Sequence, residues 1–169
     1  MVEFLKIREV KDPQRDKGNA GIDVFVPELT VGYIKDFTLK NPDIYVNIEE
    51  GYFSIGPGQS ALIPLGLKTK FEENIALEAA NKSGVATKKK LFVGASVVDS
   101  SYQGEIHGHV VNVGNDVQKV KFGEKIVQFI PRLIDTTEHK VHSGITEEEF
   151  FNGITTARGQ GGFGSTGTM

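Results

Sequence analysis

Short apolar segments separated by glycine, proline and asparagine are the feature that most constrains the fold of this 169-residue chain. Within 105–113 the pattern alternates, so that Val110 and Asn112 would face one side of a strand while His109 and Val111 face the other. Predicted strands cover residues 2–8, 22–26, 59–67, 75–80, 91–98, 105–113, 117–122 and 125–133. Short strands at this close spacing predict an all-β sandwich, jelly roll or barrel rather than a parallel α/β sheet.

Sustained helical periodicity is nearly absent. A helical turn is expected after Ser83, and a short helix is predicted at 146–151, where Thr146 would be the N-cap and Glu149 the capping-box residue. The sequence has no internal repeat and no sign of a second domain.

Composition narrows the functional classes. A formal net charge of −3 and a pI near 5.8 argue against general nucleic-acid or membrane binding, because neither polyanion would attract the chain at long range. The chain has no cysteine, no apolar run near the roughly 20 residues of a membrane span, and a charged N-terminus unlike a signal peptide. We therefore expect a cytoplasmic protein.

The last twelve residues, 158–169, combine Arg158 and Phe163 with five glycines. Glycine permits positive φ and lets backbone N–H groups converge on an anion. The guanidinium of Arg158 suits a phosphate, and Phe163 offers a flat face for a base. The segment is predicted to be a mobile arm that closes over a nucleotide, and the alternative is a flexible tail without a role.

Two segments carry features of an anion site. In 81–86 a strand ends in Lys82, Ser83 and Gly84, where a cation, a hydroxyl and backbone N–H groups would converge on an anion. Equally, Ser83 would be an ordinary helix cap there. Asp23 opens a strand after a glycine and, taken alone, is a turn residue.

Two further segments carry groups suited to catalysis. In 94–104 an apolar strand runs into Asp99 and then Tyr102 before a returning strand, which predicts a hairpin with a carboxylate and an aromatic ring at its tip. Such a carboxylate can take a proton from water, although a turn aspartate beside a packing tyrosine is the simpler interpretation. In 122–129 the amide of Gln128 interrupts an apolar strand and needs partners.

Taken together and in this order, the five segments resemble the motifs of the trimeric dUTP diphosphatase (dUTPase) family. The matching segments are AGIDV, NKSGVA, VGASVVDSSYQGEI, FGEKIVQFI and RGQGGFGSTG. The resemblance implies an all-β jelly-roll barrel over 1–157, a flexible arm over 158–169, and a homotrimer with three shared active sites. It leaves a viral or phage origin open.

The implied reaction is dUTP plus water giving dUMP and pyrophosphate, with Mg²⁺ held mainly by the triphosphate, which limits uracil in DNA and supplies dUMP. Asp99 would activate the attacking water, and Tyr102 would lie beneath the deoxyribose and exclude a 2′-hydroxyl. Gln128 and Arg158 would act at the phosphates, and Asp23 through Mg²⁺-bound water or Arg158. The implied base contacts are Ser96, Val97, Val98, His107 and Phe163, and the implied phosphate contacts Lys82, Ser83, Gly84, Gly164, Ser165 and Thr166.

The chain departs from the family pattern in three places. Lys82 stands where the family usually has arginine, which keeps the charge and loses the bidentate fork. Ser96 replaces a customary glycine, which narrows the uracil pocket unless its side chain points away. Residues 28–56 form a longer connection than usual and are too aromatic for a disordered loop. We expect an elaborated hairpin packed on its own barrel, with a partner-binding insert as the alternative.

Two other functions are alternatives to that of a dUTPase. The related dCTP deaminases share this fold, but they place a catalytic glutamate where this chain has His109 and a tryptophan at the position of Tyr102. A regulatory protein that uses nucleotide as a switch and residues 28–56 as a partner surface is the other alternative, and it does not exclude catalysis.

Overall fold

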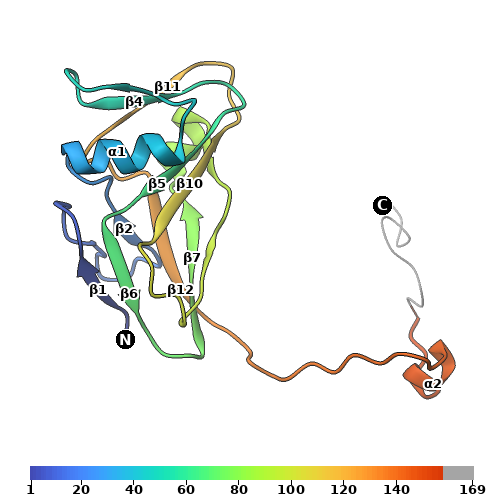
Figure 1. Cartoon of the computed structure of the whole chain (residues 1–169). Coiled ribbons are helices and arrows are strands. Elements are labelled where there is room, and N and C mark those ends of the chain that lie inside the picture. The colour runs from blue at the N-terminus through green and yellow to red at the C-terminus, as the bar shows by residue number, and fades with distance from the viewer. Residues whose placement is uncertain (158–169) are drawn as a thin grey trace. The chain divides into compact units, whose positions relative to one another are not determined.

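The computed structural model describes residues 1–157. Contacts divide the chain into two compact units, the first spanning Met1–Asp135 and the second beginning at Thr136. The first unit contains the strands shown in Figure 1. The structure does not test the boundary predicted at residue 158, because residues 158–169 lie outside the described part of the chain.

Four antiparallel sheets form the first unit. One sheet pairs β1 (Glu3–Lys6) with β6 (Leu67–Lys70), and another has the order β5 (Ser60–Pro64), β10 (His107–Asn112), β8 (Leu91–Val93). A third has the order β11 (Gln118–Lys121), β4 (Tyr52–Ile55), β3 (Tyr45–Asn47). The largest has the order β2 (Ile22–Val24), β12 (Val127–Leu133), β7 (Ile75–Asn81), β9 (Val97–Val98).

These sheets enclose a single apolar core and confirm the predicted all-β class. Fully buried side chains reach it from different sheets, among them Phe53 on β4, Ile63 on β5 and Phe129 on β12. The alternation predicted for β10 is also confirmed, because its residues are buried and half-buried in turn. Burial of alternate residues is what fixes the register of a strand against a core.

Two predicted strands are each divided. The segment 59–67 becomes β5 and β6, separated at Gly66, whose φ of 69° is incompatible with a continuous strand. The segment 91–98 becomes β8 and β9, and β9 pairs with β7 rather than with the returning strand β10. Strands β3 and β4, and residues 68–70 of β6, lie outside the predicted strands.

The insert, residues 28–56, contains a helix that the sequence analysis missed. Helix α1 (Val31–Lys40) begins at Thr30, whose side-chain oxygen accepts a hydrogen bond from the backbone N–H of Tyr33. Tyr33 and Phe37 are one helical turn apart and are both buried. The ring of Phe37 lies 4.6 Å from that of Phe53 on β4.

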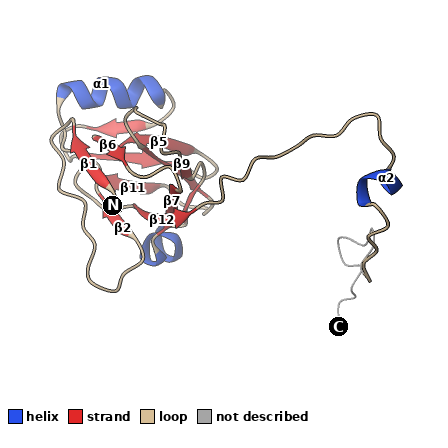
Figure 2. Cartoon of the chain, turned by 90° about the horizontal axis from the view of Figure 1, so that it is seen from below, coloured by secondary structure: helices blue, strands red, loops and turns tan. Residues whose placement is uncertain are grey.

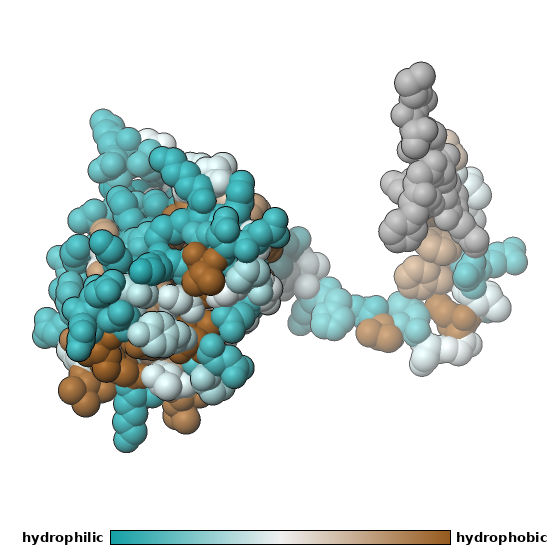
Figure 3. Space-filling view, turned by 90° about the horizontal axis from the view of Figure 1, so that it is seen from above, coloured by the Kyte–Doolittle hydropathy of each residue, from teal (hydrophilic) through white to brown (hydrophobic). Residues whose placement is uncertain are grey.

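The expectation of a hairpin in the insert is correct for β3 and β4 and wrong for 31–40. Both parts pack on the barrel, as expected, and the hydroxyl of Tyr33 donates to the carbonyl of Pro64 on β5 at 3.1 Å. Seen from the side of α1 and β4, the surface is mostly hydrophilic with scattered apolar groups (Figure 3). The partner-binding alternative is not tested by these contacts.

Two short helical segments were predicted. Residues Val85–Lys89 form one π-helical turn, which lies on the opposite side of the strands from α1 (Figure 2). Gly84 occupies its N-cap position without a side-chain hydrogen bond, so the interpretation of Ser83 as a helix cap is wrong. Helix α2 (Glu147–Phe151) has the predicted capping box between Thr146 and Glu149. No helix among residues 1–157 is long and apolar enough to cross a membrane.

Candidate active site

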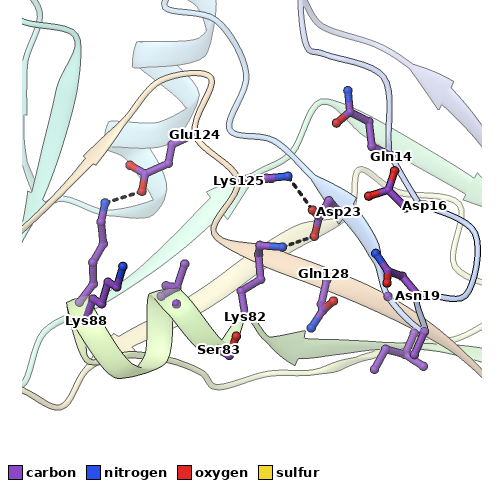
Figure 4. Close-up of a pocket in the computed structure, with 16 residues that line it drawn as sticks. Gln14, Asp16, Asn19, Asp23, Lys82, Ser83, Lys88, Glu124, Lys125 and Gln128 are labelled. Carbon is purple, nitrogen blue, oxygen red and sulfur yellow. Dashed lines mark hydrogen bonds and ion pairs between the residues drawn. The ribbon is translucent and has the colours of Figure 1, made fainter.

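The predicted site residues gather in two separate pockets. The first, here the lysine pocket, has a volume of about 700 Å³ and contains Asp23, Lys82, Ser83, Gly84 and Gln128. It lies between β2, β12, the end of β7 and the π-helical turn (Figure 4). The remaining charged side chains in its wall are those of Asp16, Lys88, Lys89, Glu124 and Lys125.

Asp23 is the electrostatic centre of the lysine pocket. Lys82 and Lys125 converge on its two carboxylate oxygens, with Lys125 Nζ at 2.9 Å from Oδ2 (Figure 4). Burial alone would raise the pKa of Asp23, but the hydrogen bonds from both lysines outweigh it and lower that pKa. The carboxylate is therefore charged at neutral pH and holds two ammonium groups in place.

The side-chain amide of Gln128 forms a hydrogen bond, as expected for a polar group in an apolar strand. Its Nε2 donates to the carbonyl of Asn81 at 2.9 Å, which leaves the amide at the pocket wall. Gly21 makes this placement sterically allowed, because a Cβ at position 21 would come within 2.6 Å of the Gln128 Cδ and overlap its Oε1. The glycine of the AGIDV segment is thus a space requirement for Gln128.

Ser83 and Gly84 are exposed at the start of the π-helical turn, as an anion site requires. The carbonyl of Ser83 accepts a hydrogen bond from Thr87 Oγ1 at 2.7 Å, which fixes the first residues of the turn. Behind them Lys89 pairs with Glu124 and also donates to the carbonyl of Lys119 at 2.9 Å. Ser83 and Gly84 therefore line a cavity rich in lysine.

The second pocket, here the hairpin pocket, has a volume of about 210 Å³. That is less than the roughly 300–1,000 Å³ of a pocket for a complete small ligand, so it suits one part of a larger molecule. Its wall contains the predicted residues Ser96, Val97, Val98, Asp99, Tyr102 and His107, together with Leu62, Ala79, Ala95, Ile106, His109 and Phe129.

Asp99 and Tyr102 lie in the predicted turn. The backbone N–H of Tyr102 donates to the Asp99 carbonyl at 3.1 Å, and the Asp99 side chain is exposed. The hydroxyl of Tyr102 donates to the carbonyl of Glu105 at 3.0 Å, which fixes the ring at the pocket edge. Gly104 leaves room for that ring, because a Cβ there would overlap the hydroxyl.

The imidazole of His107 is half-buried in the wall of the hairpin pocket. Burial and the nearby charge of Lys40 lower its pKa, while Glu105 opposes them. A lowered pKa keeps the ring neutral at pH 7. Within residues 1–157, its buried Nε2 has no hydrogen-bond partner.

The two pockets lie on opposite faces of the β2-β12-β7-β9 sheet. Gln128 and Phe129 are neighbours on β12, so their side chains point to opposite faces. Asp23 is paired with Gln128 and lines the lysine pocket with it, whereas Ala79 is paired with Phe129 and lines the hairpin pocket. One chain therefore presents the two halves of the predicted site in different directions.

Sequence reasoning missed several polar members of the pockets, among them Lys125 and His109. Lys125 was seen only as part of a charged turn, and its pairing with Asp23 depends on the register of β2 against β12. His109 accepts a hydrogen bond from the backbone N–H of Ala95 at 2.9 Å, which argues against an acid role at this position. The predicted residues Arg158, Phe163, Gly164, Ser165 and Thr166 lie outside the described residues.

The described side chains fit a metal ion that is carried by phosphate. Among residues 1–157 there is no cluster of three or more His, Asp or Glu side chains that would hold an ion by itself. Mg²⁺ usually keeps several waters and needs only one or two carboxylates beside the phosphates of a substrate. Asp23 offers such a carboxylate, although two lysines already contact it.

A comparison with family models decides the class. The dUTPase family model matches residues 43–167. The chain belongs to the dUTPase family. Its sequence is 35% identical over 127 residues to the deoxyuridine 5′-triphosphate nucleotidohydrolase of Chlamydia trachomatis, covering 74% of this chain and 82% of that one. The Thermoanaerobacter enzyme of the same name is 32% identical, with 74% and 80% covered.

Solved dUTPase structures have the same fold. A G164S mutant of the Staphylococcus bacteriophage 80alpha dUTPase with dUpNHpp covers 99% of this chain and 98% of its own, with a TM-score of 0.72 and 18% identity. The dUTPase of EIAV has a TM-score of 0.62 and 20% identity, with 86% and 99% covered. For the dUTPase of Staphylococcus aureus phage phi11, a coordinated structural Mg(II) ion is described, at a TM-score of 0.65, 16% identity and 87% and 99% coverage. This dUTPase therefore has the predicted jelly-roll fold.

Proposed function

We propose that this dUTPase hydrolyses dUTP to dUMP and pyrophosphate at sites that combine the hairpin pocket of one chain with the lysine pocket of another in a homotrimer. The observation that carries the proposal is the placement of the two pockets on opposite faces of one sheet. A single nucleotide needs both pockets, and a neighbouring chain supplies the missing half.

The hairpin pocket would bind the deoxyuridine part. β9 is the last strand of its sheet, so the backbone polar groups of Val97 and Val98 on the side away from β7 are available to a ligand. Strand-like hydrogen bonds from this edge and from His107 would match the uracil ring, whereas the amino group of cytosine would meet a mismatched donor. Tyr102 would lie beneath the sugar and exclude a 2′-hydroxyl.

The lysine pocket would bind the triphosphate. Its wall contains four lysines (Lys82, Lys88, Lys89, Lys125) against three carboxylates (Asp16, Asp23, Glu124). Ser83 and Gly84 would contact phosphate oxygens through the hydroxyl and backbone N–H groups. Lys82 would act as a point charge in place of the family arginine, and Asp23 holds it in the cavity.

Asp99 would act as the general base in the chemical step. Its carboxylate accepts a proton from water, the water oxygen forms a bond to the α-phosphorus, and the opposite bond to the pyrophosphate oxygen breaks. When bound to the triphosphate, Mg²⁺ would neutralise part of its charge, with Asp23 as a water-mediated contact. Gln128 would orient the α-phosphate and the attacking water, so positioning rather than covalent chemistry dominates.

Residues of the arm would complete the site. Arg158, Ser165 and Thr166 would contact the terminal phosphates, Gly164 would contribute backbone N–H, and Phe163 would cover the uracil. This part of the proposal rests on the sequence motif alone, because the arm lies outside the described residues.

Co-expression of two inactive variants tests the shared site. Asp99→Asn damages only the hairpin pocket, and Gln128→Ala damages only the lysine pocket. In randomly mixed trimers, about a quarter of the sites would combine an intact pocket from each variant and regain activity. Each variant expressed alone is the control. Mixed oligomers with no more activity than either control would show that both halves come from one chain.

A further inference from the structure

His109 on β10 has no role in the reaction proposed above, and it fixes a segment of the hairpin pocket. Its Nδ1 accepts a hydrogen bond from the backbone N–H of Ala95 at 2.9 Å, and its carbonyl accepts one from the N–H of Gly94, also at 2.9 Å. On the other side, the carbonyl of Ser96 accepts a bond from the N–H of Ala79 on β7 at 2.6 Å. The segment 94–96 is therefore held between β10 and β7.

The absence of a side chain at Gly94 leaves room for this imidazole. A Cβ at position 94 would come within 2.6 Å of Cε1 of His109 and would overlap Nδ1. Gly94 is not among the residues with positive φ, so its backbone conformation does not itself require glycine. The absent side chain serves to let the ring of His109 approach the backbone of Ala95.

The insert stabilises the residue of β5 that is paired with His109. Asn41, the C-cap of α1, accepts a hydrogen bond from the N–H of Leu62 at 2.7 Å and donates to the carbonyl of Leu62 at 2.9 Å. Leu62 is the residue paired with His109 across β5 and β10. Leu62 and His109 also separate the hairpin pocket from a neighbouring cavity of about 240 Å³ that is lined by residues 40–44 of the insert.

We propose that His109 is a positioning residue that holds the uracil-reading segment, residues 95–98, in place through its hydrogen bond to Ala95. The inference deepens the proposed function and rests on it in one respect, the binding of the base in the hairpin pocket. Because His109 acts on the segment and not on the phosphates, its loss weakens substrate binding and leaves the chemical step intact.

A pair of substitutions separates this role from a general effect on folding. His109→Leu removes the acceptor, whereas His109→Asn keeps an acceptor oxygen near the position of Nδ1. Loss of one such hydrogen bond should raise the KM for dUTP and the Kd for dUpNHpp by about two- to tenfold in H109L, with kcat close to native. H109N should recover most of the binding. A thermal melt of each variant shows whether the fold is intact.

A Gly94→Ala substitution tests the contact between Gly94 and His109. In the native background its new Cβ displaces the imidazole and should weaken dUpNHpp binding as H109L does. In a His109→Ala background the Cβ has room, so the second substitution should add little. Native-like binding by H109L, or equal losses in H109L and H109N, would overturn the positioning role. Failure of the native protein itself to bind dUpNHpp or hydrolyse dUTP would instead overturn the proposed function.

Discussion

The lysine pocket and the hairpin pocket bind through different physical means. In the lysine pocket, lysines and carboxylates are paired with each other before any ligand arrives, as Asp23 is with Lys82 and Lys125. In the hairpin pocket, the binding groups are backbone edges, a neutral imidazole and a tyrosine ring. The comparison teaches that one half of the site is organised by charge and the other by shape and main-chain hydrogen bonds.

The largest expected effect separates chemistry from binding within the hairpin pocket. Asp99→Asn should lower kcat by about 10²–10⁴-fold, because an amide cannot take a proton from water. The Kd for dUpNHpp should stay close to native, since the shape of the pocket is unchanged. Single-turnover kinetics and titration calorimetry measure the two quantities. Near-native turnover in this variant would show that another group is the base.

A smaller effect is expected where the lysine pocket depends on close packing. Gly21→Ala should displace the amide of Gln128 and lower kcat/KM by up to about 100-fold, as a shift of about 1 Å in a positioning group can do. Gly32→Ala on α1 is the matched control, because nothing lies within 4 Å of its added Cβ. If both variants lose activity equally, steric displacement of Gln128 is not the cause.

The charge organisation of the lysine pocket predicts salt dependence. Lys125→Ala should raise the KM for dUTP by about two- to fivefold at low ionic strength, and the effect should shrink as salt screens the remaining charges. Lys70→Ala on β6 removes the same charge from an exposed strand end and serves as the control. A KM for K125A that is unchanged, or that shifts by the same factor at every salt concentration, would contradict this view of the pocket.

A further effect concerns stability at the base of the hairpin. Burial would raise the pKa of Glu105, but hydrogen bonds from Arg8 and the N–H of Gly66 lower it below the usual 4.5. A folded-state pKa below the unfolded one adds stability at pH above 4.5 and loses it as the pH falls. Glu105→Gln should therefore lower the free energy of unfolding by about 2 kcal/mol at pH 7. In urea titrations the difference should narrow below pH 4.5; a constant difference would assign it to packing.

The strands and motif positions were predictable because their signals are local. Alternation along β10 and the turn at Asp99 depend on neighbouring residues, and the Thr146 capping box spans only four positions. Helix α1 gave no such signal. Its buried face consists of Tyr33 and Phe37, while exposed Val31 and a helix-weakening glycine obscure the period.

The long-range contacts of the site could not be read from the chain. The pairing of Lys125 with Asp23 and of His109 with Ala95 depends on which strands lie side by side and in which register. The two pockets lie on opposite faces because the consecutive residues Gln128 and Phe129 point to opposite sides of one sheet. The order of the strands in that sheet cannot be read from the sequence.

Helix α1 is connected to the barrel by hydrogen bonds and an ion pair. Tyr33 bonds to Pro64, Asn41 bonds to Leu62, and Asp36 shares Arg8 with Glu105 at the base of the hairpin. Removal of α1 would expose to water the polar groups of β5 and of Arg8 that now bond to it. Helix α1 is therefore not a detachable module.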